Sequence, residues 1–136
     1  MDDTWPAILI IDDEFNMRYF ATELFRLEGI SSHAVADGCQ GLDYLTEVIQ
    51  KQGKLPRVII LDMMMPCKDG YQVYAEIADA NWIENTEIVV VSAARDIELP
   101  LGRAKVHILY KPYEVTALLD IVRRAAPDLF GDQATT

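Results

Sequence analysis

The chain has 136 residues, a length typical of one domain, and its 22 acidic residues against 12 basic ones give a formal net charge of −10. This charge argues against direct binding to nucleic acid, since contacts to phosphate require clusters of lysine and arginine. The apolar runs are too short to cross a bilayer and the start Met1-Asp2-Asp3 lacks a basic signal segment, so we expect a cytoplasmic protein without membrane insertion.

Apolar runs typical of strands alternate along the chain with segments in which apolar residues have helical spacing. In chain order, the expected elements are the strand Ala7–Ile11, the helix Asn16–Leu27, the strand Ser31–Val35, the helix Gly38–Lys51, the strand Arg57–Leu61, the helix Tyr71–Ala80, the strands Glu87–Val91 and Val106–Leu109, and the helix Glu114–Ala126. In the first helix, Phe20, Leu24 and Leu27 form one apolar stripe, which we expect to face the core.

The strands read as continuous runs of Val, Ile and Leu, a pattern typical of strands that helices cover on both faces. We therefore expect an α/β fold with a parallel sheet, a domain at residues 1–128 and a flexible tail at residues 129–136. The segment Ala93–Lys105, which joins the last two strands, is near the usual minimum of about 10–12 residues for a crossover. Because Pro100 and Gly102 interrupt it, the fourth helix is expected to be very short or irregular.

Polar side chains follow the predicted strands at their carboxyl ends, where open parallel sheets form their sites. Asp12 and Asp13 follow the first strand, Asp62 the third, Ser92 the fourth and Lys111 the fifth. Carboxylates gathered at one place need compensation, and Mg²⁺ prefers oxygen ligands of this kind. Since an aspartate can attack phosphorus, the set predicts magnesium-assisted transfer of a phosphoryl group to an aspartate.

The chain resembles the response-regulator receiver domains of two-component signalling. The resemblance extends from about Ala7 to Ala126 and rests on Ile10-Ile11-Asp12-Asp13-Glu14, on Asp62 to Pro66 with Asp69-Gly70, on Val91-Ser92-Ala93, and on Lys111-Pro112. It implies a three-layer flavodoxin-like (βα)5 fold with a five-stranded sheet in the order 2-1-3-4-5. It also implies a phosphoacceptor module of a two-component system or phosphorelay, which catalyses only its own phosphorylation and dephosphorylation and is otherwise no enzyme.

Partners follow from the same resemblance. The phosphoryl donor would be a histidine kinase or a histidine phosphotransfer protein. Because no further domain follows Ala126 in the sequence, output is expected through a protein partner or a homodimer, without direct contact to nucleic acid.

The resemblance implies a role for each polar residue of the site. Asp62 would be the phosphoacceptor, Asp13 would bind Mg²⁺ directly and Asp12 through water. The backbone carbonyl of Met64 would complete the protein ligands of the metal, and Lys111 would contact the phosphoryl group. No cofactor other than Mg²⁺ is expected.

A conformational switch is implied as well. Ser92 would supply the switch hydroxyl, and Pro112 would follow a cis peptide bond. Receivers often carry Tyr or Phe three residues before the lysine, whereas this chain has Ile108 there. Tyr110 shares the strand parity of Ile108 and His107 is its neighbour, so either would replace the ring, or the aromatic half of the switch is absent.

Each residue taken alone also has a purely structural interpretation. The run Asp12-Asp13-Glu14 would be an acidic cap of the first helix, Ser92 an N-cap and Lys111 a solvated surface lysine. For the whole chain, the alternatives are a flavodoxin-like Mg²⁺-dependent phosphohydrolase and a non-phosphorylated pseudo-receiver scaffold. A hydrolase would need a further acid or base near Asp62, and a scaffold would not need every chemical position to be filled.

Met64 and Ala94 lie two residues beyond Asp62 and Ser92, at positions that flank the phosphoryl group in receivers. Neither side chain can orient a water molecule for attack. We therefore expect slow self-dephosphorylation.

The two cysteines, Cys39 and Cys67, have no metal-ligand spacing and do not predict a disulfide. We expect them to be reduced, as is usual in the cytoplasm. Cys67 lies in the loop that follows Asp62, but we do not expect its oxidation to matter for the site.

Overall fold

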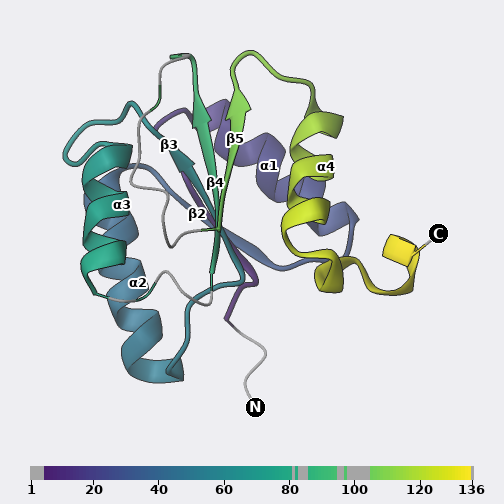
Figure 1. Cartoon of the computed structure of the whole chain (residues 1–136), viewed down its shortest axis with the longest axis horizontal. Coiled ribbons are helices and arrows are strands. Elements are labelled where there is room, and N and C mark those ends of the chain that lie inside the picture. Colours follow the sequence, from purple (N-terminus) through teal and green to yellow (C-terminus); the bar gives the residue numbers. More distant parts are fainter. Residues whose placement is uncertain (1–4, 81, 83–85, 95–96, 98–104, 136) are drawn as a thin grey trace.

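The computed structural model describes residues 5–80, 82, 86–94, 97 and 105–135. Its five strands form one parallel sheet in the order β2-β1-β3-β4-β5, as expected. The strands are β1 (Ile8–Ile11), β2 (Ser32–Val35), β3 (Val58–Asp62), β4 (Glu87–Ser92) and β5 (Lys105–Tyr110). All of their carboxyl ends therefore lie along one edge of the sheet, the upper edge in Figure 1.

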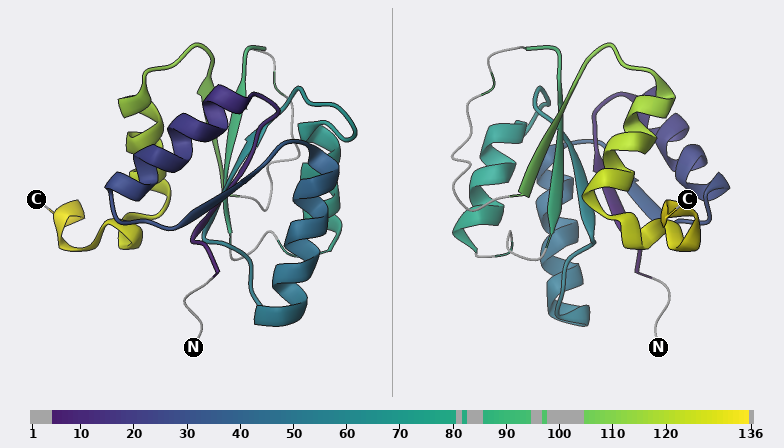
Figure 2. Two further views of the ribbon diagram at one scale, coloured as in Figure 1. Left: turned by 180° about the vertical axis from the view of Figure 1, so that it is seen from behind. Right: turned by 45° about the vertical axis from the view of Figure 1, so that its right-hand side comes forward.

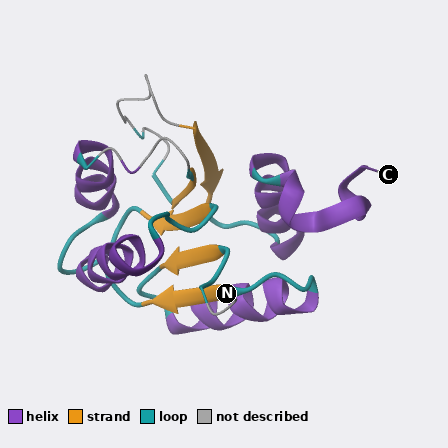
Figure 3. Cartoon of the chain, turned by 90° about the horizontal axis from the view of Figure 1, so that it is seen from below, coloured by secondary structure: helices purple, strands orange, loops and turns teal. Residues whose placement is uncertain are grey.

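Helices cover both faces of this sheet. They are α1 (Phe15–Leu27), α2 (Gly38–Gln52), α3 (Gly70–Asp79) and α4 (Val115–Ala125), and the 3-10 segment η2 (Pro127–Thr135) follows the last. Figures 1 and 2 show α1 and α4 on one face and α2 and α3 on the other, and Figure 3 shows the sheet between the two helical layers. No helix within the described ranges is both long and apolar enough to cross a membrane.

The core consists of two apolar layers, one on each face of the sheet. Successive side chains along a strand point to opposite faces and so belong to different layers. Ile8 and Ile10 of β1 face α1 and α4, whereas Leu9 and Ile11 face α2 and α3. All four side chains are buried, which is why the strand reads as a continuous apolar run instead of an alternating one. The sheet is therefore packed against helices on both faces just below its carboxyl edge.

The buried stripe of α1 differs from the predicted one. Phe20 and Leu27 are exposed by 57% and 74%, whereas Ala21 and Phe25 are buried and Leu24 packs against the core. The helix is thus rotated by about one residue, roughly 100°, from the orientation that the pattern predicted. Two apolar stripes overlap in this sequence, and contact with the sheet and α4 decides which one is buried.

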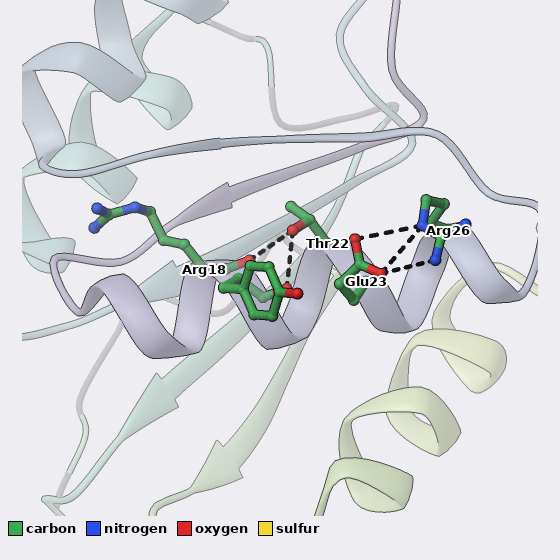
Figure 4. A network of polar contacts seen from close by, with 5 residues as sticks. Arg18, Thr22, Glu23 and Arg26 are labelled. Atoms are coloured by element: carbon green, nitrogen blue, oxygen red, sulfur yellow. Dashed lines mark hydrogen bonds and ion pairs between the residues drawn. The ribbon is translucent and has the colours of Figure 1, made fainter.

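The polar side of α1 carries hydrogen bonds and an ion pair among Arg18, Thr22, Glu23 and Arg26 (Figure 4). The Arg18 guanidinium donates a hydrogen bond to the Asp12 carbonyl at 2.9 Å, and the Thr22 hydroxyl donates to the Arg18 carbonyl at 2.9 Å. Arg26 and Glu23 form an exposed ion pair at 2.8 Å, which contributes little to stability. The contact of Arg18 positions the start of α1 beside the carboxyl edge of the sheet.

Cys39 and Cys67 form a disulfide, so the expectation that they do not pair is wrong. Their spacing of 28 residues gives no local signal, but the fold brings their Cα atoms to 5.9 Å, within the range that a disulfide requires. The bond joins the start of α2 to the loop between β3 and α3. Gly38 makes this approach possible, because a Cβ atom there would collide with the carbonyl oxygen of Lys68.

The segment between β4 and β5 is described only at Ala93, Ala94 and Ile97, and none of these three residues is helical. The other positions to which the prediction of a short or irregular fourth helix refers, with Pro100 and Gly102 among them, lie outside the described residues. In the described part of the chain, α4 follows β5 and occupies the place of the fifth helix of a (βα)5 fold.

The expected tail differs from the structure at its first two residues. Phe130 is buried in the layer beneath α1 and α4, Leu129 packs against the same layer, and the Arg123 guanidinium lies 4.7 Å from the centre of the Phe130 ring. An ion pair of 2.7 Å also ties Asp128 to Arg57, just before β3. The packed domain therefore extends at least to Phe130, and flexibility beyond it stays a prediction.

Candidate functional site

The structure brings the three predicted carboxylates together at the carboxyl edge of the sheet. Asp12 and Asp13 directly follow β1, and Asp62 is the last residue of the neighbouring strand β3. One carboxylate oxygen from each lies within 4.8 Å of the others. Asp12 and Asp62 are 5% and 3% exposed, whereas Asp13 is exposed to solvent. The cluster thus has a buried floor and one carboxylate at its mouth.

Asp62 is buried with two polar contacts. Its Oδ1 accepts a hydrogen bond from the Met64 backbone N–H at 3.2 Å, and its Oδ2 lies 3.6 Å from the Lys111 ammonium. Burial and the adjacent Asp12 charge nevertheless raise the pKa of Asp62 from 3.8 to about 6. The two contacts oppose this rise without cancelling it, so the positive charge of Lys111 does not balance the carboxylates of the ionised site.

Asp12 is turned into the same site by the loop that leads to α1. Its Oδ1 accepts a hydrogen bond from the Glu14 backbone N–H at 2.9 Å, and its own N–H donates to the Val35 carbonyl at 3.2 Å. Burial is the main cause that raises the pKa of Asp12. Glu14 is the N-cap of α1, but its side chain accepts no capping hydrogen bond from the described residues of the helix. Helix capping therefore does not explain this acidic run.

Ser92 and Lys111 close the other side of the site. Ser92 ends β4 and Lys111 directly follows the paired strand β5, and the Lys111 backbone N–H donates to the Ser92 carbonyl at 2.8 Å. The Ser92 side chain is buried, and its Oγ accepts from the Ala94 N–H at 3.0 Å. Lys111 precedes Pro112 through a cis peptide bond, as expected. The contact with Asp62 excludes the interpretation of Lys111 as a surface lysine without a partner.

Residues 107, 108 and 110, the candidates for the aromatic switch position, lie on different faces of β5. Ile108 is half-buried and packs in the layer beneath α2 and α3. His107 points to the opposite face, where its Nε2 lies 2.8 Å from a carboxylate oxygen of Glu87. Tyr110 shares the face of Ile108 and pairs in register with Ser92. The geometry therefore favours Tyr110 over His107 as the ring next to the Ser92 hydroxyl, for which a switch role is predicted.

Tyr113 is a site residue that the sequence analysis missed. It is half-buried in the turn before α4, and burial together with the Asp12 and Asp62 charges raises the pKa of its hydroxyl to about 12. A pocket of about 410 Å³ opens beside it; its lining comprises Glu14, Met17, Ala93, Lys111, Pro112 and Tyr113. The only signal in the sequence is that Tyr113 follows Lys111 by two residues.

The donor set fits Mg²⁺. It consists of carboxylate oxygens from Asp12, Asp13 and Asp62, which are the hard ligands that this cation prefers, and no sulfur atom belongs to it. The raised pKa of Asp62 has the same implication, because burial and mutual repulsion penalise the ionised cluster and a divalent cation would compensate for both.

Comparison with known proteins identifies a family to which the sequence is similar. The family model described as response regulator receiver domain matches residues 8–123. Sporulation initiation phosphotransferase F of Bacillus subtilis is 28% identical over 125 residues, which cover 88% of this chain and 93% of that protein. Protein PilG of Pseudomonas aeruginosa is 27% identical over 126 residues, which cover 88% of this chain and 87% of that protein.

The fold comparison agrees. A CheY-like receiver domain structure from Methanospirillum hungatei matches with a TM-score of 0.74 at 20% identity, and the match covers 90% of this chain and 94% of that one. A likeness at this identity supports the fold alone. The family match favours a phosphoacceptor domain over a flavodoxin-like phosphohydrolase. Because the family model spans most of the sequence and the site residues stand where the strands end, this chain belongs to the response regulator receiver domain family.

Proposed function

We propose that Asp62 accepts a phosphoryl group from a phosphohistidine of a histidine kinase or histidine phosphotransfer protein, in a reaction that depends on Mg²⁺. The observation that carries the proposal is the burial of Asp62 between the carboxylates of Asp12 and Asp13 and the ammonium of Lys111. The domain turns over no separate substrate, since it catalyses only its own phosphorylation and dephosphorylation. We also propose that it acts in the cytoplasm.

The residues divide the chemistry among them. Asp12, Asp13 and Asp62 would hold Mg²⁺ with the carbonyl of Met64, Asp12 acting through water. When bound, the cation supplies positive charge that keeps Asp62 ionised and neutralises phosphoryl oxygens. One carboxylate oxygen of Asp62 attacks phosphorus, the bond from phosphorus to the donor nitrogen breaks with its electron pair going to that nitrogen, and the phosphoryl group passes to the carboxylate. Lys111, already 3.6 Å from Asp62, offsets the charge of a phosphoryl oxygen.

Ser92 is the group through which phosphorylation changes the shape of the domain. Its Oγ accepts a hydrogen bond from Ala94 in this structure, and a phosphoryl oxygen on Asp62 would be a new acceptor for its hydroxyl proton. Movement of Ser92 would shift Tyr110, its register partner on β5, while Ile108 stays packed in the core. We propose that this change alters a surface read by a protein partner or by a second copy of the domain.

The donor would approach through a pocket next to the site. This pocket, lined by Met17, Lys111 and Tyr113, lies between the start of α1 and the turn before α4, and Lys111 also contacts Asp62. Its volume of about 410 Å³ accommodates an imidazole ring. The name of the Bacillus subtilis relative, a phosphotransferase, supports the same class of reaction.

The test is incubation with acetyl phosphate and Mg²⁺, followed by intact mass measurement. We expect one phosphoryl adduct in the native chain, none in Asp62→Asn, and none when a chelator removes Mg²⁺. Asp43→Asn is a matched control, because Asp43 is an exposed carboxylate on α2. An adduct of equal yield in Asp62→Asn, or no adduct in the native chain, would show that the proposal is wrong.

A further inference from the structure

The disulfide between Cys39 and Cys67 lies in the loop that leaves the phosphoacceptor. This loop, residues 63–69, begins directly after Asp62 and ends at the start of α3. Cys67 is exposed and Cys39 is half-buried, so a reagent in solution can reach the bond from the side of Cys67. The bond is therefore open to exchange with other thiols.

The loop is anchored to the site at both of its ends. The Met64 N–H donates to Asp62, and the Gly70 N–H donates to the Met63 carbonyl at 3.1 Å. A Cβ atom at Gly70 would lie 2.8 Å from the Asp62 carbonyl, so the end of the loop packs against the backbone of the acceptor itself. Cys67 lies between these anchors, and its conformation bears on where the Met64 carbonyl points.

Cys67 has a backbone conformation that needs support. Its φ of 70° lies in the left-handed region, which residues other than glycine seldom adopt unless their surroundings impose it. The disulfide to Cys39 supplies such a constraint, and the close approach of Gly38 to Lys68 supplies another on the same side. Without the bond, Cys67 loses one of these two constraints, and the loop gains conformational freedom.

The fold does not require this cross-link. The domain has two buried apolar layers that meet on a fully covered sheet, and chains of this size form such cores without disulfides. The bond also lies at the carboxyl edge of the sheet, where the acidic cluster lies. Its position points to a role in the site.

We propose that Cys39 and Cys67 form a reversible thiol–disulfide site, oxidised by low-molecular-weight disulfides, whose oxidised state orders the loop that presents the Met64 carbonyl to Mg²⁺. The first half of this proposal stands on the cysteine pair alone, and the effect on Asp62 rests on the proposed function. A cell that oxidises the pair would thereby raise the reactivity of the phosphoacceptor.

The exchange balances without a further reactant. The Cys67 thiolate attacks a small disulfide, one sulfur of which forms a mixed disulfide while the other leaves as a thiolate. The Cys39 thiolate then attacks the Cys67 sulfur and releases the second small thiolate. The pair loses two electrons and two protons in total, the small disulfide is reduced to two thiols, and reduction of the protein is the reverse.

The experiment compares the two redox states of the native chain. The protein is equilibrated in mixtures of reduced and oxidised glutathione, free thiols are alkylated, and intact mass gives the fraction that is cross-linked. Mg²⁺ affinity from protein fluorescence, hydrogen exchange of residues 63–69 and the rate of phosphorylation by acetyl phosphate are then measured for each state. Cys39→Ser is the control, since reductant must leave its Mg²⁺ affinity unchanged.

We expect the reduced chain to bind Mg²⁺ about 3- to 10-fold more weakly and to be phosphorylated more slowly, as follows if the ordered loop is populated for only about a tenth to a third of the time. Equal affinity, exchange and rates in the two states would overturn the inference and leave the proposed function intact. No adduct in either state would overturn the proposed function instead. Stoichiometric Zn²⁺ binding by the reduced chain, with Asp37 as a third ligand, would replace the redox site with a metal site.

Discussion

Replacing Asp62 with asparagine should stabilise the domain in the absence of Mg²⁺. Burial and the Asp12 charge raise the pKa of Asp62 from 3.8 to about 6. This difference in pKa means that the ionised carboxylate destabilises the folded state by about 3 kcal/mol, since each pKa unit corresponds to about 1.4 kcal/mol. The Asp62 side chain is only 4% exposed, so solvent screening removes little of this energy. Asparagine keeps the shape and the acceptor oxygen for Met64 without the charge.

The effect has a defined pH window. The unfolded chain releases the Asp62 proton near pH 3.8 and the folded domain near pH 6, so the folded state binds more protons between these values. The native chain therefore loses stability relative to Asp62→Asn as the pH rises through this window. The two proteins should be equally stable below it and differ by up to about 3 kcal/mol above it.

Urea unfolding with a chelator present measures the difference. With a urea slope of about 1–3 kcal/mol/M, the midpoint of Asp62→Asn should lie about 1–3 M higher at about pH 7.5 and coincide with that of the native chain at about pH 4. Asp43→Asn, at an exposed position on α2, serves as the control for removal of a charge. Equal midpoints for Asp62→Asn and the native chain at both pH values would refute the electrostatic argument.

Three further predictions concern the metal, the cross-link and the lifetime of the adduct. Mg²⁺ at about 100 times its Kd should raise the free energy of unfolding by about 2.7 kcal/mol, and Asp13→Ala should remove this gain in thermal melts. Reduction of the disulfide, which spans 28 residues, should lower the free energy of unfolding by about 3–4 kcal/mol. Urea unfolding curves measured with and without reductant test this, and curves that coincide would contradict it. Met64→Asn and Ala94→Glu, both at exposed positions, should speed loss of the phosphoryl group by orienting water, and an unchanged decay of the adduct by intact mass would show that these positions have no such role.

The strands and the site carboxylates were predictable because their signals are local. Four consecutive apolar residues from Ile8 to Ile11 are all buried, and Asp12 follows them at once. Since strands in a parallel sheet share one carboxyl edge, the pattern predicts that Asp62 and Asp12 lie on the same edge. The resemblance to receivers then supplied the strand order and the cis bond before Pro112, and both are present in the structure.

The buried face of α1 was not predictable in the same way. Phe20 and Leu27 have the spacing of a core stripe, yet Ala21 and Phe25 occupy the core. Periodicity shows that a helix is amphipathic, but the rotation that it adopts depends on how its side chains fit the sheet and the neighbouring helix. The exposed stripe that results includes Phe20 and Tyr19, whose rings contact each other at 5.9 Å between centres.

By itself, the sequence determined the order of the elements, the residues at the end of each strand and the class of chemistry that they can perform. Only the tertiary structure decided that Cys39 and Cys67 meet, that the charges of Asp12 and Asp62 act on Tyr113, and that Asp62 is buried deeply enough for its pKa to reach about 6. Local patterns encode which conformation a segment prefers. How the layers pack decides which segments distant along the chain come into contact and which side chains lose their water.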